Sequence, residues 1–269
     1  MPKPFPMQIK WDAAEYAANS VPQLAWAREL IARLNLRGDE HILDVGCGDG
    51  KITAEIAMSL TRGSATGVDA SPQMVEFARK TFPSARVPNV RFHAMDARKI
   101  KFERQFDLVF SNATLHWVDD HLAFLRGTAA CLRSDGRLVV SCGGKGNAQD
   151  VFVALRPVMR MKRWREYFRK LEAPYFFHSP ADYEKWLPRF GFKTRHVQLA
   201  PKDATYAGRD GFATWLRTTW LPYTQRVPEG LREEFIAAVT DRYVARHPPD
   251  AEGQVHVRMV RLEIDAVKS

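Results

Sequence analysis

Short apolar segments alternate with longer amphipathic ones in the first half of the chain. Five segments are apolar and short enough for buried strands: 41–46, 64–70, 89–97, 106–113 and 136–144. Segments with helical periodicity lie between them: 51–60, 72–82 and 119–132. Such alternation predicts a parallel sheet covered by helices on both faces.

The flanking regions are more helical. A helical stretch over 12–35 is interrupted at Pro22, where Ser20 can cap a new helix. After Gly146 the pattern predicts further helices within four segments: 148–172, 179–192, 208–224 and 228–248. Strands are expected at 193–200 and at 254–268, and the alternation of the last fits an antiparallel strand at the end of the sheet.

These elements predict an α/β fold built on a doubly wound, seven-stranded, mostly parallel sheet, with helices inserted around its last strands. We expect an N-terminal helical lid at 1–37. The α/β core is expected to comprise 38–145, 176–200 and 253–269, and a helical substrate lid 146–175 and 201–252. In such a sheet, ligands bind outside the carboxyl ends of the strands.

Composition narrows the class of protein. Of 269 residues, 45% are hydrophobic and 26% charged, which is ordinary for a globular protein. The sequence has no apolar run long enough to span a membrane and no apolar centre of a signal peptide near residue 1. The three cysteines form no CxxC pair, so we expect reduced thiols and a cytoplasmic location. The sequence carries no signal for an oligomeric state.

The formal net charge of +9 fits a nucleic-acid footprint, a basic surface or a site for an acidic small molecule. The basic residues are dispersed, apart from the segment 160–170. No zinc-finger, helix-turn-helix or RNP-like pattern surrounds that segment. We therefore do not expect a nucleic-acid partner.

A glycine-rich turn follows the first strand, in "HILDVGCGDGKIT". Glycines at 46, 48 and 50 give GxGxG, where a dinucleotide fingerprint requires GxGxxG, and Lys51 stands at the place of its third glycine. There is also no GKS or GKT of a P-loop. The turn therefore predicts close approach of the backbone to a ligand that need not carry a phosphate.

Three acids end three successive strands. They are Asp44, Asp69 and Asp96. Each alone fits a turn or a helix cap, but together with the glycine turn they predict one site at the carboxyl edge of the sheet. A carboxylate in the position of Asp69 can accept both hydroxyls of a ribose.

"ILDVGCGDG", "VDAS", "MDA" and "FDLVFSNATLHW" resemble the first four motifs of the class I S-adenosylmethionine-dependent methyltransferases. The resemblance is strong over 38–145 and implies their Rossmann-like sheet and S-adenosylmethionine as cofactor. It also implies the cofactor-binding residues: Asp44, Gly46, Cys47, Gly48, Asp69, Ala70, Met74, Asp96, Ala97 and Asn112.

The resemblance gives these residues roles. Asp44 and the glycines would hold the methionine part, and Asp69 the ribose hydroxyls. Met74 would cover the adenine, Asp96 and the Ala97 amide would meet its polar edge, and Asn112 would contact the amino end.

"NATLHW" resembles a stretch shared by the trans-aconitate methyltransferases and the insect juvenile hormone acid methyltransferases, which esterify small carboxylic acids. Tyr16, Ser20 and Gln23 also match the Y-x-x-x-[NS]-x-x-Q spacing of the second family. The resemblance implies that Gln23 and Trp117 face the substrate carboxylate, with His116 beside them. There is no [DNS]PP[YFW] element of the base-methylating enzymes, and no metal cluster is expected.

Several of these residues have a second interpretation. Gln23 with Ser20 fits a capping box, His116 and Trp117 fit core packing, and Trp11 and Tyr16 fit either a lid or simple packing against the sheet. Three arginines fit either a solvated helix face or a contact with a substrate carboxylate: Arg160, Arg163 and Arg165.

The sequence thus predicts a methyltransferase that O-methylates a carboxylate of a small organic acid. A carboxylate is ionised at neutral pH and needs no general base, whereas His116 would be the candidate base for a hydroxyl or amine. The alternatives are N-, O- or C-methylation of another small metabolite, or a protein that binds S-adenosylmethionine without catalysis.

Overall fold

The computed structural model describes residues 21–269, with side chains from residue 25 onward. The chain divides into two compact units. One contains the described residues from 21 to 145 together with Tyr175–Ala200 and Val260–Ser269, and the other contains Gly146–Pro174 and Pro201–Met259.

The sheet has seven strands in the order β3-β2-β1-β4-β5-β7-β6. Their bounds are β1 His41–Val45, β2 Ser64–Asp69, β3 Val90–Ala94, β4 Phe106–Asn112, β5 Leu132–Gly143, β6 Phe192–Ala207 and β7 Gln254–Lys268. The first five strands pair in parallel, and β7 pairs antiparallel with β5. The predicted doubly wound, mostly parallel sheet is therefore confirmed.

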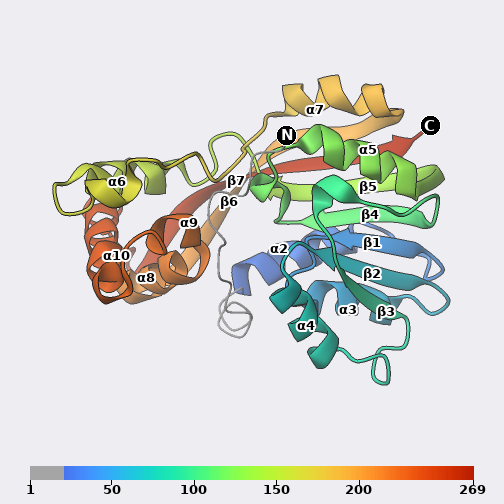
Figure 1. The fold of residues 1–269 in the computed structure, drawn as a ribbon, viewed down its shortest axis with the longest axis horizontal. Helices are drawn as coiled ribbons and strands as arrows, with labels where there is room; N and C mark the ends of the chain where they lie inside the picture. The colour runs from blue at the N-terminus through green and yellow to red at the C-terminus, as the bar shows by residue number, and fades with distance from the viewer. Residues whose placement is uncertain (1–20) are drawn as a thin grey trace. The chain divides into compact units, whose positions relative to one another are not determined.

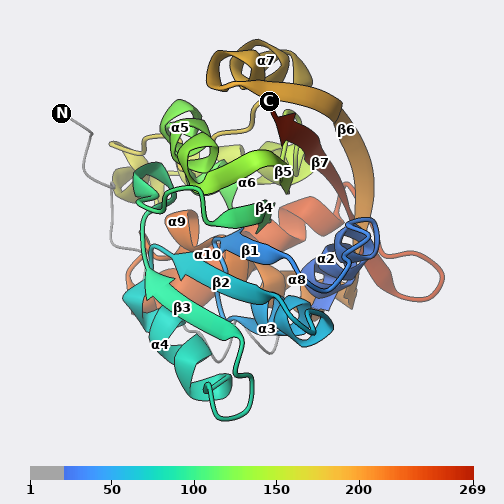
Figure 2. The same ribbon diagram turned by 90° about the vertical axis from the view of Figure 1, so that its right-hand side faces the viewer.

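Helices cover both faces of the sheet in the first unit (Figures 1 and 2). On one face lie α2 (Val21–Ala32), α3 (Lys51–Ser59) and α4 (Pro72–Thr81). On the other lie α5 (His121–Cys131) and α7 (Pro180–Trp186). Capping residues set where two of these helices begin: Ser71 accepts from the Met74 amide at 3.3 Å, and Asp120 from the Ala123 amide at 2.8 Å.

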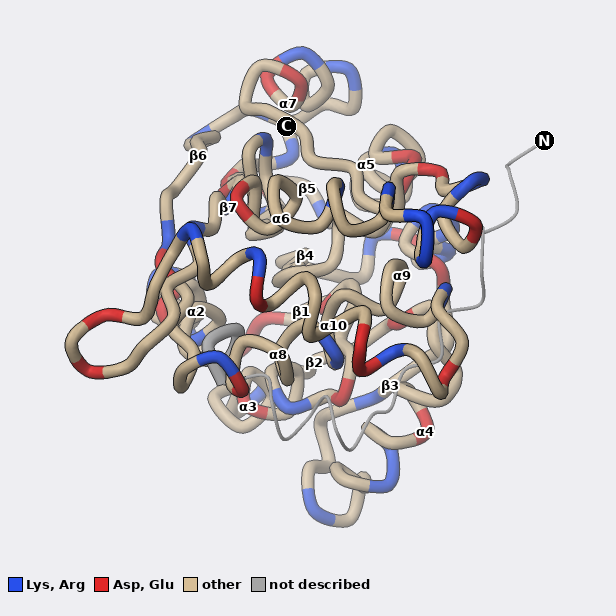
Figure 3. The backbone as a smooth tube through the Cα atoms, turned by 90° about the vertical axis from the view of Figure 1, so that its left-hand side faces the viewer, with Lys and Arg blue, Asp and Glu red and all other residues tan. Residues whose placement is uncertain are grey.

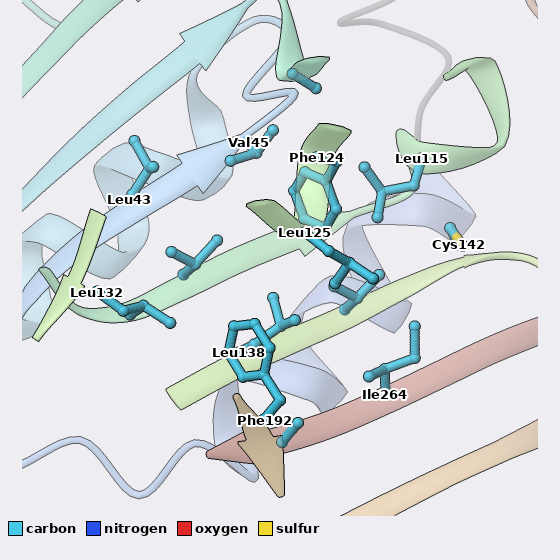
Figure 4. Close-up of a cluster of buried hydrophobic side chains, with 14 of the residues drawn as sticks. Leu43, Val45, Leu115, Phe124, Leu125, Leu132, Leu138, Cys142, Phe192 and Ile264 are labelled. Carbon is cyan, nitrogen blue, oxygen red and sulfur yellow. The ribbon is translucent and has the colours of Figure 1, made fainter. Parts of the chain in front are cut away.

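Two apolar clusters hold these layers together. The cluster under α5 and α7 joins side chains of β1, β5 and β7 to Phe124 and Leu125 of α5 (Figure 4). The cluster on the other face joins Leu30 of α2, Ile56 of α3 and Val75 of α4 to the same sheet. Burial on both faces explains why the central strands are continuously apolar in the sequence.

The second unit contains four helices among the described residues: α6 (Gln149–Arg160), α8 (Gly208–Thr219), α9 (Leu221–Thr224) and α10 (Glu229–Val244). Buried rings join them, since Phe235 of α10 packs edge-on against Trp164 and Phe212 of α8 stacks on Tyr243. None of the helices in residues 21–269 has the length and apolar character needed to cross a bilayer.

The structure extends one predicted strand and specifies two other predictions more closely. β6 continues to Ala207 instead of ending at residue 200. β7 is antiparallel as expected, but β6 forms the edge of the sheet beside it. The segment 148–172 forms one helix, α6, followed by the 3₁₀ turn Arg165–Phe168.

Lys and Arg are interspersed with Asp and Glu along the described chain (Figure 3).

Candidate functional site

The glycine turn lies at the carboxyl end of β1, where the strand order reverses between β2 and β4. Gly46, Gly48 and Gly50 all have positive φ, at 80°, 52° and 80°. A Cβ on Gly46 would lie 2.0 Å from Thr114 Oγ1, whereas a Cβ on Gly48 would meet nothing within 4 Å. The turn is therefore closed towards β4 and open at Gly48, which leaves room for a ligand beside the Gly48 backbone.

Asp69, at the end of β2, is bound to this turn. Its Oδ2 accepts from the Gly48 amide at 3.0 Å and its Oδ1 from the Ser71 amide at 2.8 Å. Burial raises the pKa of Asp69, although the two amide hydrogen bonds oppose this. Each carboxylate oxygen keeps a lone pair beyond these bonds, so the group is oriented to accept two hydroxyl donors.

Asp44, near the end of β1, is almost fully buried and accepts from the hydroxyl of Thr53 in α3 at 2.6 Å. Burial raises its pKa to about 7, the Thr53 hydrogen bond lowers it, and the nearby negative charge of Asp69 raises it further. Asp49 in the glycine turn is also buried. Three carboxylates thus lie at or next to the turn, where a positively charged ligand would offset the cost of burying them.

Asp96 precedes the 3₁₀ turn Ala97–Lys99 and is held by Arg98. The Arg98 guanidinium donates to both carboxylate oxygens, at 3.0 Å from Nε and 2.6 Å from Nη2, and also to Asp119 at 2.8 Å. Burial raises the pKa of Asp96, but the hydrogen bonds from Arg98 outweigh it and the pKa lies below its ordinary value. Asp96 is therefore an oriented anion at the end of the third strand.

The other predicted cofactor residues lie near these acids in the chain, with different exposure. Met74 is buried in the first turn of α4, Ala97 is buried, and Ala70 is exposed beside Asp69. Cys47 is buried, and burial raises the pKa of its thiol well above the ordinary value. The thiol is thus neutral and unsuited to nucleophilic chemistry.

Asn112, at the end of β4, is close to an arginine from the far end of the chain. Arg261 in β7 is 5% exposed and donates from Nη2 to Asn112 Oδ1 at 3.4 Å and to the Ser141 carbonyl at 2.7 Å. These bonds orient the Asn112 amide and place a guanidinium at the same edge of the sheet.

His116 lies in the 3₁₀ turn η2 (Leu115–Trp117) that follows β4. Its Nδ1 accepts a hydrogen bond from the main-chain amide of Gly143 at 3.3 Å. Burial, together with the positive charge of Arg261 and the neighbouring His121, lowers the pKa of His116 to about 3. The ring is therefore neutral with its proton on Nε2, so that it acts as a hydrogen-bond donor.

Aromatic rings surround His116. The ring of Trp117 packs edge-on against Tyr175, with centroids 4.8 Å apart, and Phe177 stacks on both His116 and Tyr175 at 6.0 and 5.5 Å. The Phe176 amide donates to the His116 carbonyl at 2.8 Å, which ties this aromatic segment to η2. Each of the four rings is partly exposed.

Some predicted site residues are placed elsewhere or lie outside the described part. Gln23 belongs to the first turn of α2, with its side chain not described, and Trp11 and Tyr16 lie outside the described residues. Arg160 is exposed at the end of α6 in the second unit, where Arg163 pairs with Glu234 and Arg165 with Glu166.

Four neighbours of the site were not predicted from the sequence. They are Arg98, Tyr175, Phe177 and Arg261. The aromatic run at 175–177 and the arginine two positions after Asp96 were visible signals, whereas Arg261 gave none. In residues 21–269 no group of three His, Cys, Asp or Glu side chains is arranged to hold a metal ion.

Comparison with known proteins identifies methyltransferases both by family model and by sequence identity. Residues 42–136 match the family model described as a methyltransferase domain. The chain is 30% identical to the trans-aconitate 2-methyltransferase of Agrobacterium fabrum, over 97% of this chain and 100% of that relative. It is 34% identical to a methyltransferase of Schizosaccharomyces pombe, over 70% of this chain and 72% of the relative.

Among solved structures, the fold resembles phosphoethanolamine N-methyltransferase 2 of Haemonchus contortus in complex with S-adenosyl-L-methionine. The TM-score is 0.60 at 16% identity, over 95% of this chain and 56% of the other. At that identity the likeness concerns the fold.

Proposed function

Since the chain belongs to the class I S-adenosylmethionine-dependent methyltransferases, we propose that it transfers the methyl group to a carboxylate of a small organic acid. The observation that carries this proposal is the state of His116, which the Gly143 amide holds as a neutral donor. A carboxylate needs a donor that orients it and no base that deprotonates it.

The residues at the carboxyl edge fit the cofactor. Its ribose diol requires an acceptor such as Asp69, whose two oxygens are already oriented by main-chain amides. Its positive charge suits the buried carboxylates of Asp44 and Asp49. The open space beside Gly48 allows the close approach of a flat or narrow ligand. When bound, the cofactor supplies a methyl group already activated by a sulfonium.

The residues around η2 suit the acceptor. His116 Nε2–H donates to one carboxylate oxygen and orients the other towards the reacting carbon. The rings of Trp117, Tyr175 and Phe177 exclude water, and their faces attract a positive charge. Catalysis then consists of positioning and water exclusion, for which orientation effects reach about 7–11 kcal/mol.

The comparisons support the same substrate class. Trans-aconitate 2-methyltransferases of several bacteria match this chain over almost their whole length. The name of those relatives specifies a carboxylic acid acceptor, so small polycarboxylic acids are the first compounds to test. A net charge of +9 also suits an acidic acceptor.

The decisive experiment identifies the bond that forms. Purified protein is incubated with methyl-labelled S-adenosylmethionine and a panel of small mono-, di- and tricarboxylic acids, and the product is treated with mild base. A methyl ester releases labelled methanol, whereas ethers, methylamines and C-methyl products do not. Base-stable label would reject the proposal in favour of another acceptor atom, and no transfer to any acceptor would favour a protein that binds the cofactor without catalysis.

A matched pair of variants tests the role of His116. His116→Gln retains an N–H donor, whereas His116→Leu has none. We expect His116→Gln to keep part of the activity. His116→Leu should lose about 10²-fold or more in kcat/KM for the acid, which is the effect of removing one oriented hydrogen-bond donor. Equal losses in both variants would contradict the donor role.

A further inference from the structure

A buried polar chain leads from α7 to the turn that carries His116. The Tyr183 hydroxyl in α7 lies 2.6 Å from Nδ1 of His121 in α5, and His121 Nε2 lies 2.9 Å from the Leu115 carbonyl. Tyr183 is 0% exposed and His121 is 2% exposed. These two hydrogen bonds connect α7 and α5 to Leu115, the residue immediately before His116.

For a neutral His121 ring, these two hydrogen bonds allow only one arrangement of protons. A carbonyl accepts and cannot donate, so His121 Nε2 carries the proton that meets Leu115. A neutral imidazole then has a bare Nδ1, to which the Tyr183 hydroxyl must donate. Burial and the neighbouring His178 lower the pKa of His121 to about 4, so the ring is neutral at physiological pH. Tyr183 therefore fixes the tautomer of His121.

The ring of His121 is also held from its sides. His178 packs edge-on with its centroid 4.3 Å away, and Trp186 packs at 6.1 Å. Tyr183 itself is placed by the start of α7, where Ser179 and Asp182 form a capping box with a 2.8 Å bond from the Ser179 amide. The packing of α5 and α7 thus fixes the orientation of the His121 ring, whose Nε2–H donates to the Leu115 carbonyl.

The turn η2 receives hydrogen bonds from outside itself: the amides of Gly143 and Phe176 donate to His116, and His121 donates to Leu115. It contains three residues, and no side chain caps it. Its first carbonyl, that of Leu115, also accepts from the Val118 amide at 2.9 Å, so His121 adds a second donor to the same oxygen. A short 3₁₀ turn has poor hydrogen-bond geometry of its own. An outside donor at Leu115 therefore restrains the position of the two following residues.

We propose that Tyr183 and His121 are positioning residues for the methyl transfer, and that they hold His116 and Trp117 in place through the Leu115 carbonyl. The proposal rests on the proposed function only in assigning His116 to the acceptor. Neither residue touches the reacting atoms. Without the Tyr183 hydroxyl, His121 can adopt the other tautomer, which turns a bare Nε2 towards the carbonyl and repels it.

Tyr183→Phe removes the hydroxyl and keeps the buried ring. We expect kcat/KM for the acceptor to fall between about 10- and 100-fold, because small displacements of positioning groups have effects of this size. The dissociation constant of S-adenosylhomocysteine should change less than two-fold, since the acids and glycines that hold it are untouched.

Asn89→Ala is the control. Asn89 lies at the amino end of β3, away from the site, and its Nδ2 donates to the main-chain carbonyls of Ala57 and Leu60 at 2.8 and 2.9 Å. Both variants lose side-chain hydrogen bonds that are partly or fully buried, so both melting temperatures should fall. Only Tyr183→Phe should reduce turnover at equal folded fraction, and equal activity losses in the two variants would overturn the proposal.

His121→Gln and His121→Leu supply a rescue test. The amide nitrogen of Gln reaches a position near Nε2 of the imidazole and can donate to Leu115, whereas Leu cannot donate. We expect Gln to retain several-fold more activity than Leu at equal folded fraction. Equal activity of the two variants would contradict the role of the donor.

Nitrogen-15 NMR of the histidine rings keeps this test separate from the substrate assignment. The wild-type protein should show His116 and His121 as Nε2–H tautomers, and Tyr183→Phe should shift the signals of both rings, whichever acceptor is methylated. Unchanged His116 signals in Tyr183→Phe would reject the positioning role. A base-stable methylated product would instead reject the proposed function and leave the NMR result standing.

Discussion

The main-chain amide of Gly143, at the end of β5, donates to Nδ1 of His116 across 3.3 Å. This single bond decides what the imidazole can do, because it leaves the proton on Nε2. A ring in that state donates a hydrogen bond and cannot remove a proton from an acceptor until its tautomer changes. The arrangement suits an acceptor that arrives already ionised.

His116 should remain neutral throughout the physiological pH range. Burial, the charge of Arg261 and His121 lower its pKa to about 3, so above that pH the neutral form predominates. An NMR titration from pH 5 to 8 should show no change at His116. His256 is an internal control in the same sample, because hydrogen bonds to Asp250 and Asp203 raise its pKa and it is exposed.

Arg261→Met should raise the pKa of His116, since one of the causes that lower it is removed. A His116 signal that titrates near its ordinary value of about 6.5 in the wild-type protein would contradict the neutral donor. The donor role proposed above would then fail as well.

Gly46→Ala should abolish cofactor binding, because two penalties act at this position. The residue has φ 80°, and an added Cβ would lie 2.0–2.3 Å from the side chain of Thr114. Gly253→Ala is the control, since Gly253 has φ 75° but a Cβ there meets nothing within 4 Å. We expect the control to lose about 1 kcal/mol of stability from backbone strain alone and to bind normally.

Calorimetric titration with S-adenosylhomocysteine and thermal melting check this pair. Comparable binding by Gly46→Ala and the wild-type protein would mean that the contact between the glycine turn and Thr114 does not matter for the site.

Arg98→Met should weaken cofactor binding several-fold. Arg98 holds both oxygens of Asp96 and so counteracts the effect of burial on its pKa. Without the guanidinium the pKa of Asp96 rises and its carboxylate loses its fixed orientation. Arg133→Met is the control, because Arg133 pairs with both oxygens of Asp107 at 2.8 and 2.9 Å at a more exposed position.

The measured quantity is the dissociation constant of S-adenosylhomocysteine for both variants. Equal values for Arg98→Met and Arg133→Met would show that Asp96 needs no orientation by Arg98.

The sequence predicted the sheet, and the carboxyl edge where the glycine turn and the strand-end acids lie, because their signals are local. A few consecutive residues suffice to recognise an acid at the end of a strand or glycines at alternate positions. Parallel strands then bring their carboxyl ends to one edge of the sheet. Arg261 could not be found in this way. It lies 149 positions from Asn112 and reaches it only because β7 runs antiparallel beside β5, so that Arg261 pairs with Gly143.

The buried chain through Tyr183 and His121 also escaped prediction. The two residues are 62 positions apart, on different helices, and each alone has the pattern of an ordinary core residue. The extension of β6 was missed because most of its side chains are exposed, so the strand lacks the apolar alternation of a half-buried one.

Cofactor binding should release protons, because Asp44 is buried with a pKa of about 7 in the free protein. A positively charged ligand favours the ionised carboxylate, so it lowers this pKa and strengthens its own binding as the pH rises from 6 to 8. Calorimetric titration at pH 7 in buffers of different ionisation enthalpy measures the protons released. S-adenosylhomocysteine, which lacks the sulfonium charge, should release fewer protons than S-adenosylmethionine, and Asp44→Asn should release fewer with either ligand.

The raised pKa of Asp44 also predicts how folding stability depends on pH. Cofactor binding should strengthen as the pH rises, whereas the contribution of Asp44 to stability should fall. The raised pKa of Asp44 means that the folded state binds more protons than the unfolded state between about pH 4 and 7. In the absence of cofactor the contribution of Asp44 to stability therefore falls as the pH rises through this window. The melting temperature of Asp44→Asn relative to the wild-type protein should be higher at pH 8 than at pH 5. A difference that does not depend on pH would show that Asp44 is ionised throughout the window and that its burial is already compensated in the free protein.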